Sequence, residues 1–174
     1  AAELLEEAAK AKIVLEVDAG TVGLDSSMVE RLEFKDTPLS EYYKLESAVS
    51  QIEDLKIQIR TASVRNVYRA VLKEHSDSTL KAANADLADQ VRNNPALSYI
   101  HIVGADGEVK ASSMPESVGK VKVGDREYFQ KAMKGDLFVS NVYLARTTGK
   151  PAFAVAAPLK DGDRVMGIIF GVPD

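Results

Sequence analysis

The sequence changes character near Pro95, and this division limits the possible folds more than any other feature. The residues before it form long runs rich in Ala, Leu, Glu, Lys and Gln, and no glycine occurs between Gly23 and Gly104. After it come short apolar segments that alternate with glycines. The first pattern is typical of helices and the second of strands joined by turns. The sequence therefore predicts an α+β fold with a helical region over residues 1–94 and a sheet domain over residues 95–174.

One long helix is expected from Thr37–Pro38, which suit a cap and a first turn, to about His75. Apolar residues recur along it every three or four positions, at Val49, Ile52, Leu55, Ile59 and Ala62. The pattern then continues on a rotated face from Val64 onward, as if one face met a partner and another met the sheet. Burial on two sides predicts a homodimer held by this helix.

Three further helices are expected. One covers residues 1–17 and is broken by Gly20 and Gly23, and a short one begins near Ser27. The third is capped by Asp77 and ends before Pro95, because proline disfavours a helical conformation in the residue before it.

Five strands are expected in the second half, at residues 99–103, 108–112, 138–145, 151–159 and 165–172. The first two are joined by Asp106-Gly107, a dipeptide that supplies the positive φ of tight hairpin turns. A short helix capped by Asp125 and closed by Gly135 lies between the second and third strands. Short connections between the later strands predict an antiparallel sheet.

The composition excludes several functions. The 174 residues contain no cysteine, which removes thiolate nucleophiles, Cys-based zinc sites and iron–sulfur clusters. The net charge of −4 gives no general attraction to nucleic acid. No nucleophile, phosphate-loop or metal motif occurs, and His75 and His101 form no ligand pair. We expect no catalysis, metal or cofactor.

The segment Asp125-Arg126-Glu127-Tyr128-Phe129 is the strongest candidate for a binding site. An arginine beside the amides of a helix start suits a carboxylate, with a tyrosine hydroxyl and an apolar wall beside it. The alternative is that the arginine pairs with a neighbouring acid while the two aromatic rings pack in the core. The next strand and turn add three further candidates, which are Tyr143, Arg146 and Lys150.

Several ordered motifs resemble the Cache family of extracellular sensor domains over residues 84–172. Besides the Asp-Arg segment they are, in order, Val139-Ser140-Asn141-Val142-Tyr143, Thr148-Gly149-Lys150-Pro151, Ala154-Val155-Ala156-Ala157-Pro158-Leu159 and Val165-Met166-Gly167-Ile168-Ile169. The hairpin around Asp106-Gly107 resembles the opening of the same domains.

This resemblance implies a single PAS-like sheet behind a long helix, placed between two transmembrane helices outside this sequence. It implies a periplasmic or extracellular domain of an inner-membrane receptor, foremost a chemoreceptor, with a sensor kinase, a cyclase or a ligand-free interaction module as alternatives. The implied ligand-binding residues are Arg126, Tyr128, Phe129, Tyr143, Arg146, Lys150 and His101.

Two departures from the family pattern bear on the ligand. Tyr128-Phe129 stands where amino-acid-binding members tend to have Trp-Tyr, and Val172 stands where they tend to have an acid. Without that acid an ammonium group lacks a counter-charge. A small organic acid without an amine is therefore expected, and a dicarboxylate if Arg146 or Lys150 turns inward.

Overall fold

The computed structural model describes the backbone of residues 39–174 and the side chains of residues 47–174. It divides into two compact units, Ala1–Asp54 and Leu55–Asp174. The helices expected over residues 1–17 and from Ser27, and the expected cap at Thr37–Pro38, lie outside the described residues. In the first unit the described part is the beginning of helix α3, which spans Leu39–Ser63.

The single long helix expected up to His75 is wrong, because the structure has two helices there. Helix α3 ends at Ser63, and α4 spans Asn66–Glu74. Arg65 between them has an extended conformation (φ −73°, ψ 132°). The Ser63 hydroxyl donates to the Arg60 carbonyl at 2.7 Å, which competes with continued helical bonding. The turn brings the rotated apolar face back to the sheet, so that Tyr68 and Val71 of α4 are buried.

Helix α5 spans Asp77–Arg92 and ends before Pro95, as expected, but its cap is Ser76 and not Asp77. Ser76 and Thr79 form a reciprocal capping box. On the other end of the helix pair, Tyr68 donates to Asp86, which also pairs with Arg65 at 2.7 Å. This polar cluster fixes α4 on α5.

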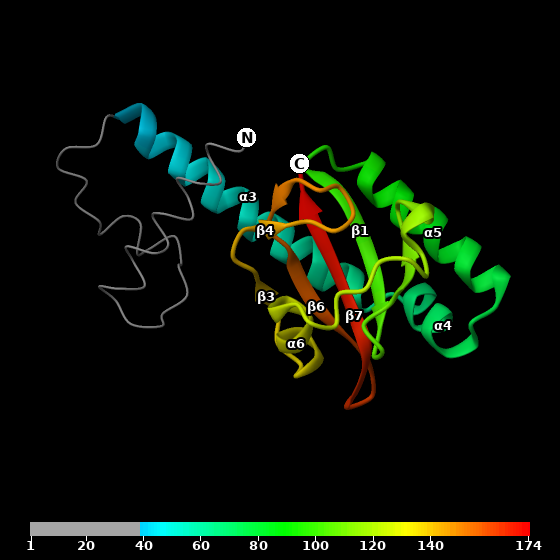
Figure 1. Ribbon diagram of the computed structural model, residues 1–174. Coiled ribbons are helices and arrows are strands. Elements are labelled where there is room, and N and C mark those ends of the chain that lie inside the picture. The colour runs from blue at the N-terminus through cyan, green and yellow to red at the C-terminus, as the bar shows by residue number, and fades with distance from the viewer. Residues whose placement is uncertain (1–38) are drawn as a thin grey trace. The chain divides into compact units, whose positions relative to one another are not determined.

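The core of the second unit is a five-stranded antiparallel sheet in the order β2-β1-β7-β6-β3 (Figure 1). Its strands are β1 (Leu97–Gly104), β2 (Val109–Ser112), β3 (Phe138–Val139), β6 (Val155–Asp161) and β7 (Arg164–Pro173). The β1–β2 hairpin turns at Gly107, whose φ is +76°. The α+β fold expected from the sequence is confirmed.

Two expected strands are each split. The segment expected to be one strand over 138–145 consists of β3 and β4 (Tyr143–Leu144), and the segment 151–159 consists of β5 (Pro151–Ala152) and β6. The chain leaves the sheet after Ser140, whose hydroxyl accepts from the Ala154 amide at 2.9 Å and donates to the Asn141 carbonyl at 2.8 Å. As a result β4 and β5 form a separate two-stranded hairpin.

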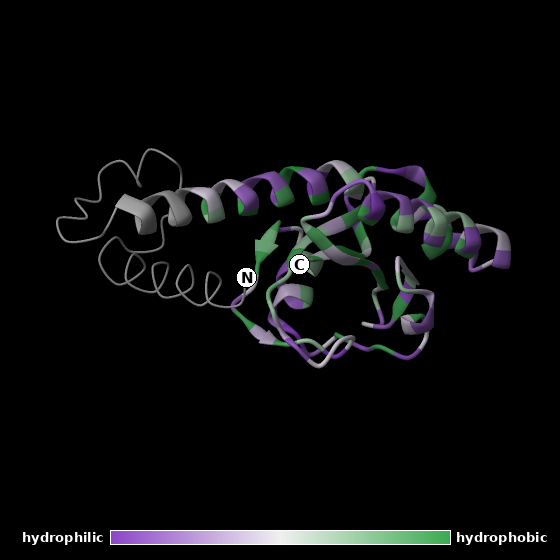
Figure 2. Ribbon diagram, turned by 90° about the horizontal axis from the view of Figure 1, so that it is seen from above, coloured by the Kyte–Doolittle hydropathy of each residue, from purple (hydrophilic) through white to green (hydrophobic). Residues whose placement is uncertain are grey.

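The sheet separates two layers of the second unit. Helices α4, α5 and the end of α3 lie on one side, whereas α6 (Glu127–Met133) and the connecting loops lie on the other (Figure 2). The compact second unit begins at Leu55, so it includes helices that precede residue 95 and pack on the sheet. Close packing is visible at Gly171, where an added β-carbon would lie 2.7 Å from Ile59 Cδ1.

Candidate functional site

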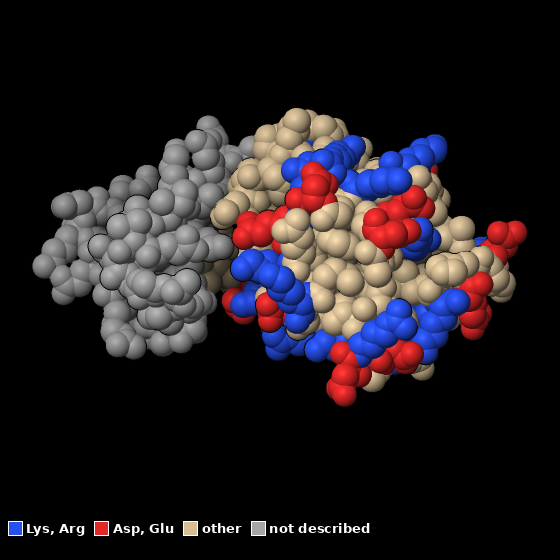
Figure 3. All heavy atoms as spheres, turned by 60° about the horizontal axis from the view of Figure 1, so that its bottom comes forward, with Lys and Arg blue, Asp and Glu red and all other residues tan. Residues whose placement is uncertain are grey.

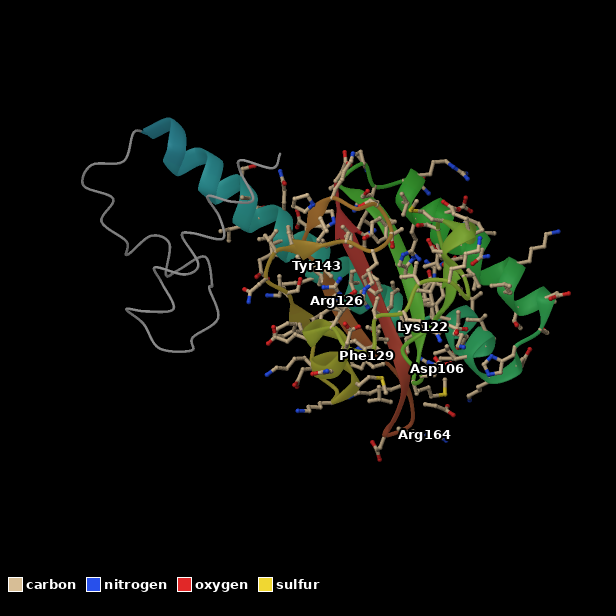
Figure 4. All side chains as sticks on the ribbon, in the orientation of Figure 1. Asp106, Lys122, Arg126, Phe129, Tyr143 and Arg164 are labelled. Carbon is tan, nitrogen blue, oxygen red and sulfur yellow. The ribbon has the colours of Figure 1, made fainter. Side chains whose placement is uncertain are left out.

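Arg126 lies directly before α6, at the N-cap position that the sequence assigned to Asp125. Its Nη2 donates to the Leu144 carbonyl at 3.1 Å, and its guanidinium carbon lies 5.0 Å from the centre of the Tyr143 ring. The Nε atom is buried and has no hydrogen-bond partner among the described residues. The guanidinium is therefore held over the β4–β5 hairpin with one donor unused, close to Tyr143 in Figure 4.

Aromatic rings from three elements meet next to this arginine. The Tyr128 ring of α6 lies 5.4 Å from the Tyr143 ring of β4 and 5.0 Å from the Phe170 ring of β7. Burial raises the pKa of Tyr128 and of Tyr143, and for Tyr143 the neighbouring Tyr128 adds to the rise. Both hydroxyls therefore remain protonated donors. The Tyr143 hydroxyl is buried and lacks a hydrogen-bond partner in the described part of the chain.

His101 lies fully buried behind these rings, on the same face of β1 as Tyr99. Its Nδ1 is 2.7 Å from the Ser112 hydroxyl and its Nε2 is 3.1 Å from the Thr147 hydroxyl. Burial lowers the pKa of His101 to about 4, so the ring is neutral at pH 7. His101 thus connects the sheet to the β4–β5 turn. The Tyr99 ring packs beside it, with the two ring centres 4.8 Å apart.

Arg146 and Lys150 of the β4–β5 turn are exposed, although the Arg146 charge still acts on the Tyr128 hydroxyl. Arg146 holds the Asp125 carboxylate with two hydrogen bonds of 2.6 and 2.7 Å and also donates to the Lys122 carbonyl at 2.6 Å. The Arg146 guanidinium lowers the pKa of Asp125 to about 2. This ion pair joins the turn to the segment before α6 and explains why Asp125 does not cap the helix.

Phe129 is buried with α6 and belongs to a core cluster that also includes Val103, Val109 and Ile168. Thus the structure brings Arg126, Tyr128, Tyr143 and His101 together, while Phe129 packs beneath them. Sequence reasoning missed Tyr99, Thr147 and Phe170. The first could have been found from strand alternation, since Tyr99 is two residues from His101 and shares its face. No local signal indicates the other two, because chain folding alone places them here.

The described residues contain no group of three or more His, Asp or Glu side chains that could hold a metal ion. Within the same residues, no helix has the length and apolarity that a bilayer crossing requires. On the face drawn in Figure 3, basic and acidic side chains are interspersed around an uncharged centre. The candidate recognition site near α6 therefore consists of Arg126 Nε, Tyr143 Oη and the aromatic rings around them.

A family model described as single Cache domain 3 matches residues 48–171. The chain belongs to this family. The match confirms the resemblance seen in the sequence motifs, and it extends the domain into α3.

Known proteins similar to this Cache domain include receptors of different kinds. The extracellular domain of the histidine kinase rpHK1S-Z16 has a TM-score of 0.59 at 20% identity, over 74% of this chain and 52% of that one. The ligand-binding domain of the Campylobacter jejuni chemoreceptor Tlp3, described in complex with L-valine, has a TM-score of 0.55 at 16% identity, over 86% and 64%. At these identities the likeness shows the fold.

A curated relative, the Citrate (Re)-synthase of Syntrophus aciditrophicus, is 27% identical over 145 residues. These residues cover 75% of this chain, and the chain spans only 22% of that relative.

Proposed function

We propose that this Cache domain is an extracellular sensor domain that binds a small organic carboxylate between Arg126 and Tyr143. One observation carries the proposal: Arg126 Nε and Tyr143 Oη are neighbouring buried donors, and neither forms a hydrogen bond of good geometry with a described residue, although the Tyr128 and Tyr99 hydroxyls lie near Tyr143 Oη. A buried donor without a partner costs about 1–3 kcal/mol. Two such donors in one place support a bound acceptor that pairs with both, and a carboxylate has two oxygens for this purpose.

The charges around the cluster favour a monocarboxylate without an amine. His101 is neutral and fully buried, and the Asp125 carboxylate is bound to Arg146, so neither of these described residues offers a free negative charge to an ammonium group. Arg146 is engaged and Lys150 is exposed, which disfavours a second carboxylate at the same site. Acetate, propionate, lactate and pyruvate fit one guanidinium, one hydroxyl and an aromatic wall. Because the Campylobacter receptor domain is described with L-valine, branched amino acids are the compounds to test beside these carboxylates.

We assign the domain to a transmembrane chemoreceptor, with flanking membrane helices outside this sequence. A sensor kinase is the second candidate, because a histidine kinase ectodomain has the same fold. The synthase similarity does not support an enzyme, since this chain corresponds to only 22% of that protein. In this proposal the domain has an open and a closed conformation, and the ligand binds the closed one more tightly. On binding, the Arg126 segment and the β4–β5 hairpin close over the sheet, and β7 shifts.

A thermal-shift screen tests the binding site directly. A ligand at a hundred times its Kd stabilises the native state by about 2.7 kcal/mol, which raises Tm by roughly 8 °C for a domain of this size. We expect this response from at least one of the four monocarboxylates and its loss in Arg126→Gln. Arg92→Gln is the matched control, because Arg92 is exposed and its ion pair within the described part of the chain is with Asp89, at 2.9 Å. If Arg126→Gln keeps the full shift while remaining folded by circular dichroism, the site is misplaced.

A further inference from the structure

A cleft of about 280 Å³ lies apart from the Arg126 cluster and shares no lining residue with it. It is formed by the end of α3, the α3–α4 turn, the second half of β6 and the connection from α6 to β3. Three of its lining residues are the cations Arg60, Arg69 and Lys160, and none is acidic. Cations that converge without a counter-charge repel one another, so the arrangement favours a bound anion.

Arg69 is held in place by hydrogen bonds to neutral partners, and its charge acts on the nearby Asp161 carboxylate without forming an ion pair with it. Its Nη1 donates to Asn66 Oδ1 at 3.2 Å and its Nη2 donates to the Val64 carbonyl at 2.7 Å. The Nε atom is buried and has no partner in the described part of the chain. The nearby Asp161 carboxylate pairs with Lys73 at 2.7 Å. Arg69 thus presents a positioned positive charge to the cleft.

Arg60 and Lys160 border the same cleft from opposite elements, one from α3 and the other from β6. No ion pair of either side chain is found among the described residues. The Lys160 ammonium lies beside the turn after α6, since Nζ is 3.6 Å from the position that a β-carbon on Gly135 would take. An anion between these groups would therefore join α3, α4, β6 and the end of α6.

We propose that this cleft binds a small soluble oxyanion with two or more negative charges, of the phosphoryl or polycarboxylate type. Its volume lies at the lower end of the range for small-molecule sites. Arginine and lysine together match such groups through charge-assisted hydrogen bonds. The anion would stabilise the junction between the long helices and the sheet edge independently of the carboxylate site.

The position of the cleft favours a soluble anion over a lipid headgroup. Lys160 pairs with Val165 at the β6–β7 turn, whereas Pro173 at the other end of β7 pairs with Leu97. Eight residues of strand separate Val165 from Pro173, which is about 26 Å. Figure 1 shows the β6–β7 turn and the C terminus at opposite ends of the strand. If the C terminus leads toward a membrane, the cleft faces away from it.

Titration calorimetry with inorganic pyrophosphate at low ionic strength tests this site. We expect saturable binding that weakens with added salt. Arg60→Gln and Lys160→Gln should each raise the Kd about five- to tenfold, which corresponds to the loss of one charge-assisted contact at a partly exposed position. Arg92→Gln, which removes an exposed arginine elsewhere, should leave the Kd unchanged.

Arg126→Gln separates this inference from the proposed function, because it should abolish the carboxylate response and leave pyrophosphate binding intact. Loss of pyrophosphate binding in Arg126→Gln would mean that the anion binds at the carboxylate site, and would overturn the proposal. The same follows if the wild-type domain binds no pyrophosphate, or if both cleft variants bind it as tightly as the wild type. Binding only to vesicles that contain phosphatidylglycerol, without binding of pyrophosphate, would also overturn it.

Discussion

The Tyr143 hydroxyl is expected to affect ligand affinity and the free energy of unfolding in opposite directions. It is buried without a hydrogen-bond partner among the described residues, so it lowers the stability of the ligand-free domain. We expect Tyr143→Phe to leave the free energy of unfolding unchanged or to raise it by about 1 kcal/mol, and to weaken carboxylate binding roughly tenfold. Urea denaturation and ligand titration measure the two effects.

Tyr68→Phe is the matched control for this substitution. Its hydroxyl donates to Asp86 and accepts from Gln90 in the α4–α5 cluster, away from the carboxylate site. The control should lower the free energy of unfolding by about 1–3 kcal/mol without changing ligand affinity. A Tyr143→Phe variant that binds carboxylate as tightly as the wild type would show that this hydroxyl does not contact the ligand.

His101 makes the stability of the domain depend on pH. Its pKa is about 4 in the folded protein and about 6.5 in an unfolded chain, so the unfolded state binds more protons between these values. Stability is therefore full above pH 6.5 and falls as the pH decreases toward 4, by about 3 kcal/mol in total. We expect His101→Gln to be less stable than the wild type at pH 7 but to lose less stability between pH 7 and pH 5.

Urea denaturation at several pH values measures this dependence. His75→Gln is the control for the loss of a histidine, because His75 is exposed at the end of α4. If the free energy of unfolding of His101→Gln depends on pH as in the wild type, while that of His75→Gln no longer does, His101 is not the source of the pH dependence.

At the residue level, the sequence indicated Arg126 and Tyr143 as candidate binding residues, but it did not indicate which groups their side chains contact. Asp125 was expected to cap α6, and the Arg146 guanidinium from the β4–β5 turn takes its carboxylate instead. Such a pairing joins residues 21 positions apart, so no local pattern could predict it.

Among the elements, α3 and the turn that follows it carry an exposed apolar stripe that suits a second copy of the chain. Ile57 in α3 is 63% exposed, and Val64, directly after the end of the helix, is 64% exposed. Leu55 and Ile59, which belong to the apolar stripe seen in the sequence, are buried on the sheet side, whereas Ile57 was not part of that stripe. We infer that the exposed face forms the expected homodimer.

Substitutions on this stripe test the dimer. The double variant Ile57→Glu and Val64→Glu should shift the molecular mass measured by analytical ultracentrifugation from dimer to monomer at micromolar concentration, because two charges would be buried at the interface. Val142→Glu is the control, since Val142 is an exposed apolar residue outside α3. A wild-type domain that is monomeric, or a double variant that stays dimeric, would contradict the inference.

Element boundaries were predictable where local chemistry sets them and not elsewhere. The Asp106-Gly107 turn and the end of α5 before Pro95 were confirmed. The break after Ser63 and the departure of the chain from the sheet after Ser140 were missed, because their helix and strand patterns continue through both points. At both breaks a serine hydroxyl bonds to the backbone, and packing on the sheet determines where the chain then continues.

For the whole second unit, β7 is the central strand of the sheet and, like β6, it meets both layers. Phe170 contacts Tyr128 on the side of the carboxylate site, and Gly171 lies against Ile59 of α3 on the opposite side. A ligand that moves the aromatic cluster would therefore displace the central strand and the helix behind it. This arrangement supports β7 as the route by which binding reaches the rest of a receptor.

The sequence by itself determined the α+β class, the antiparallel sheet, the family motifs and the arginine around which the site is built. These follow from periodicity, turn residues and composition, which are local properties. The tertiary structure alone decided which donors remain unpaired, that His101 is neutral behind the site, and that Arg60, Arg69 and Lys160 meet in one cleft. Each of these depends on burial and on contacts between distant segments, and a side chain acquires them only when the chain is packed.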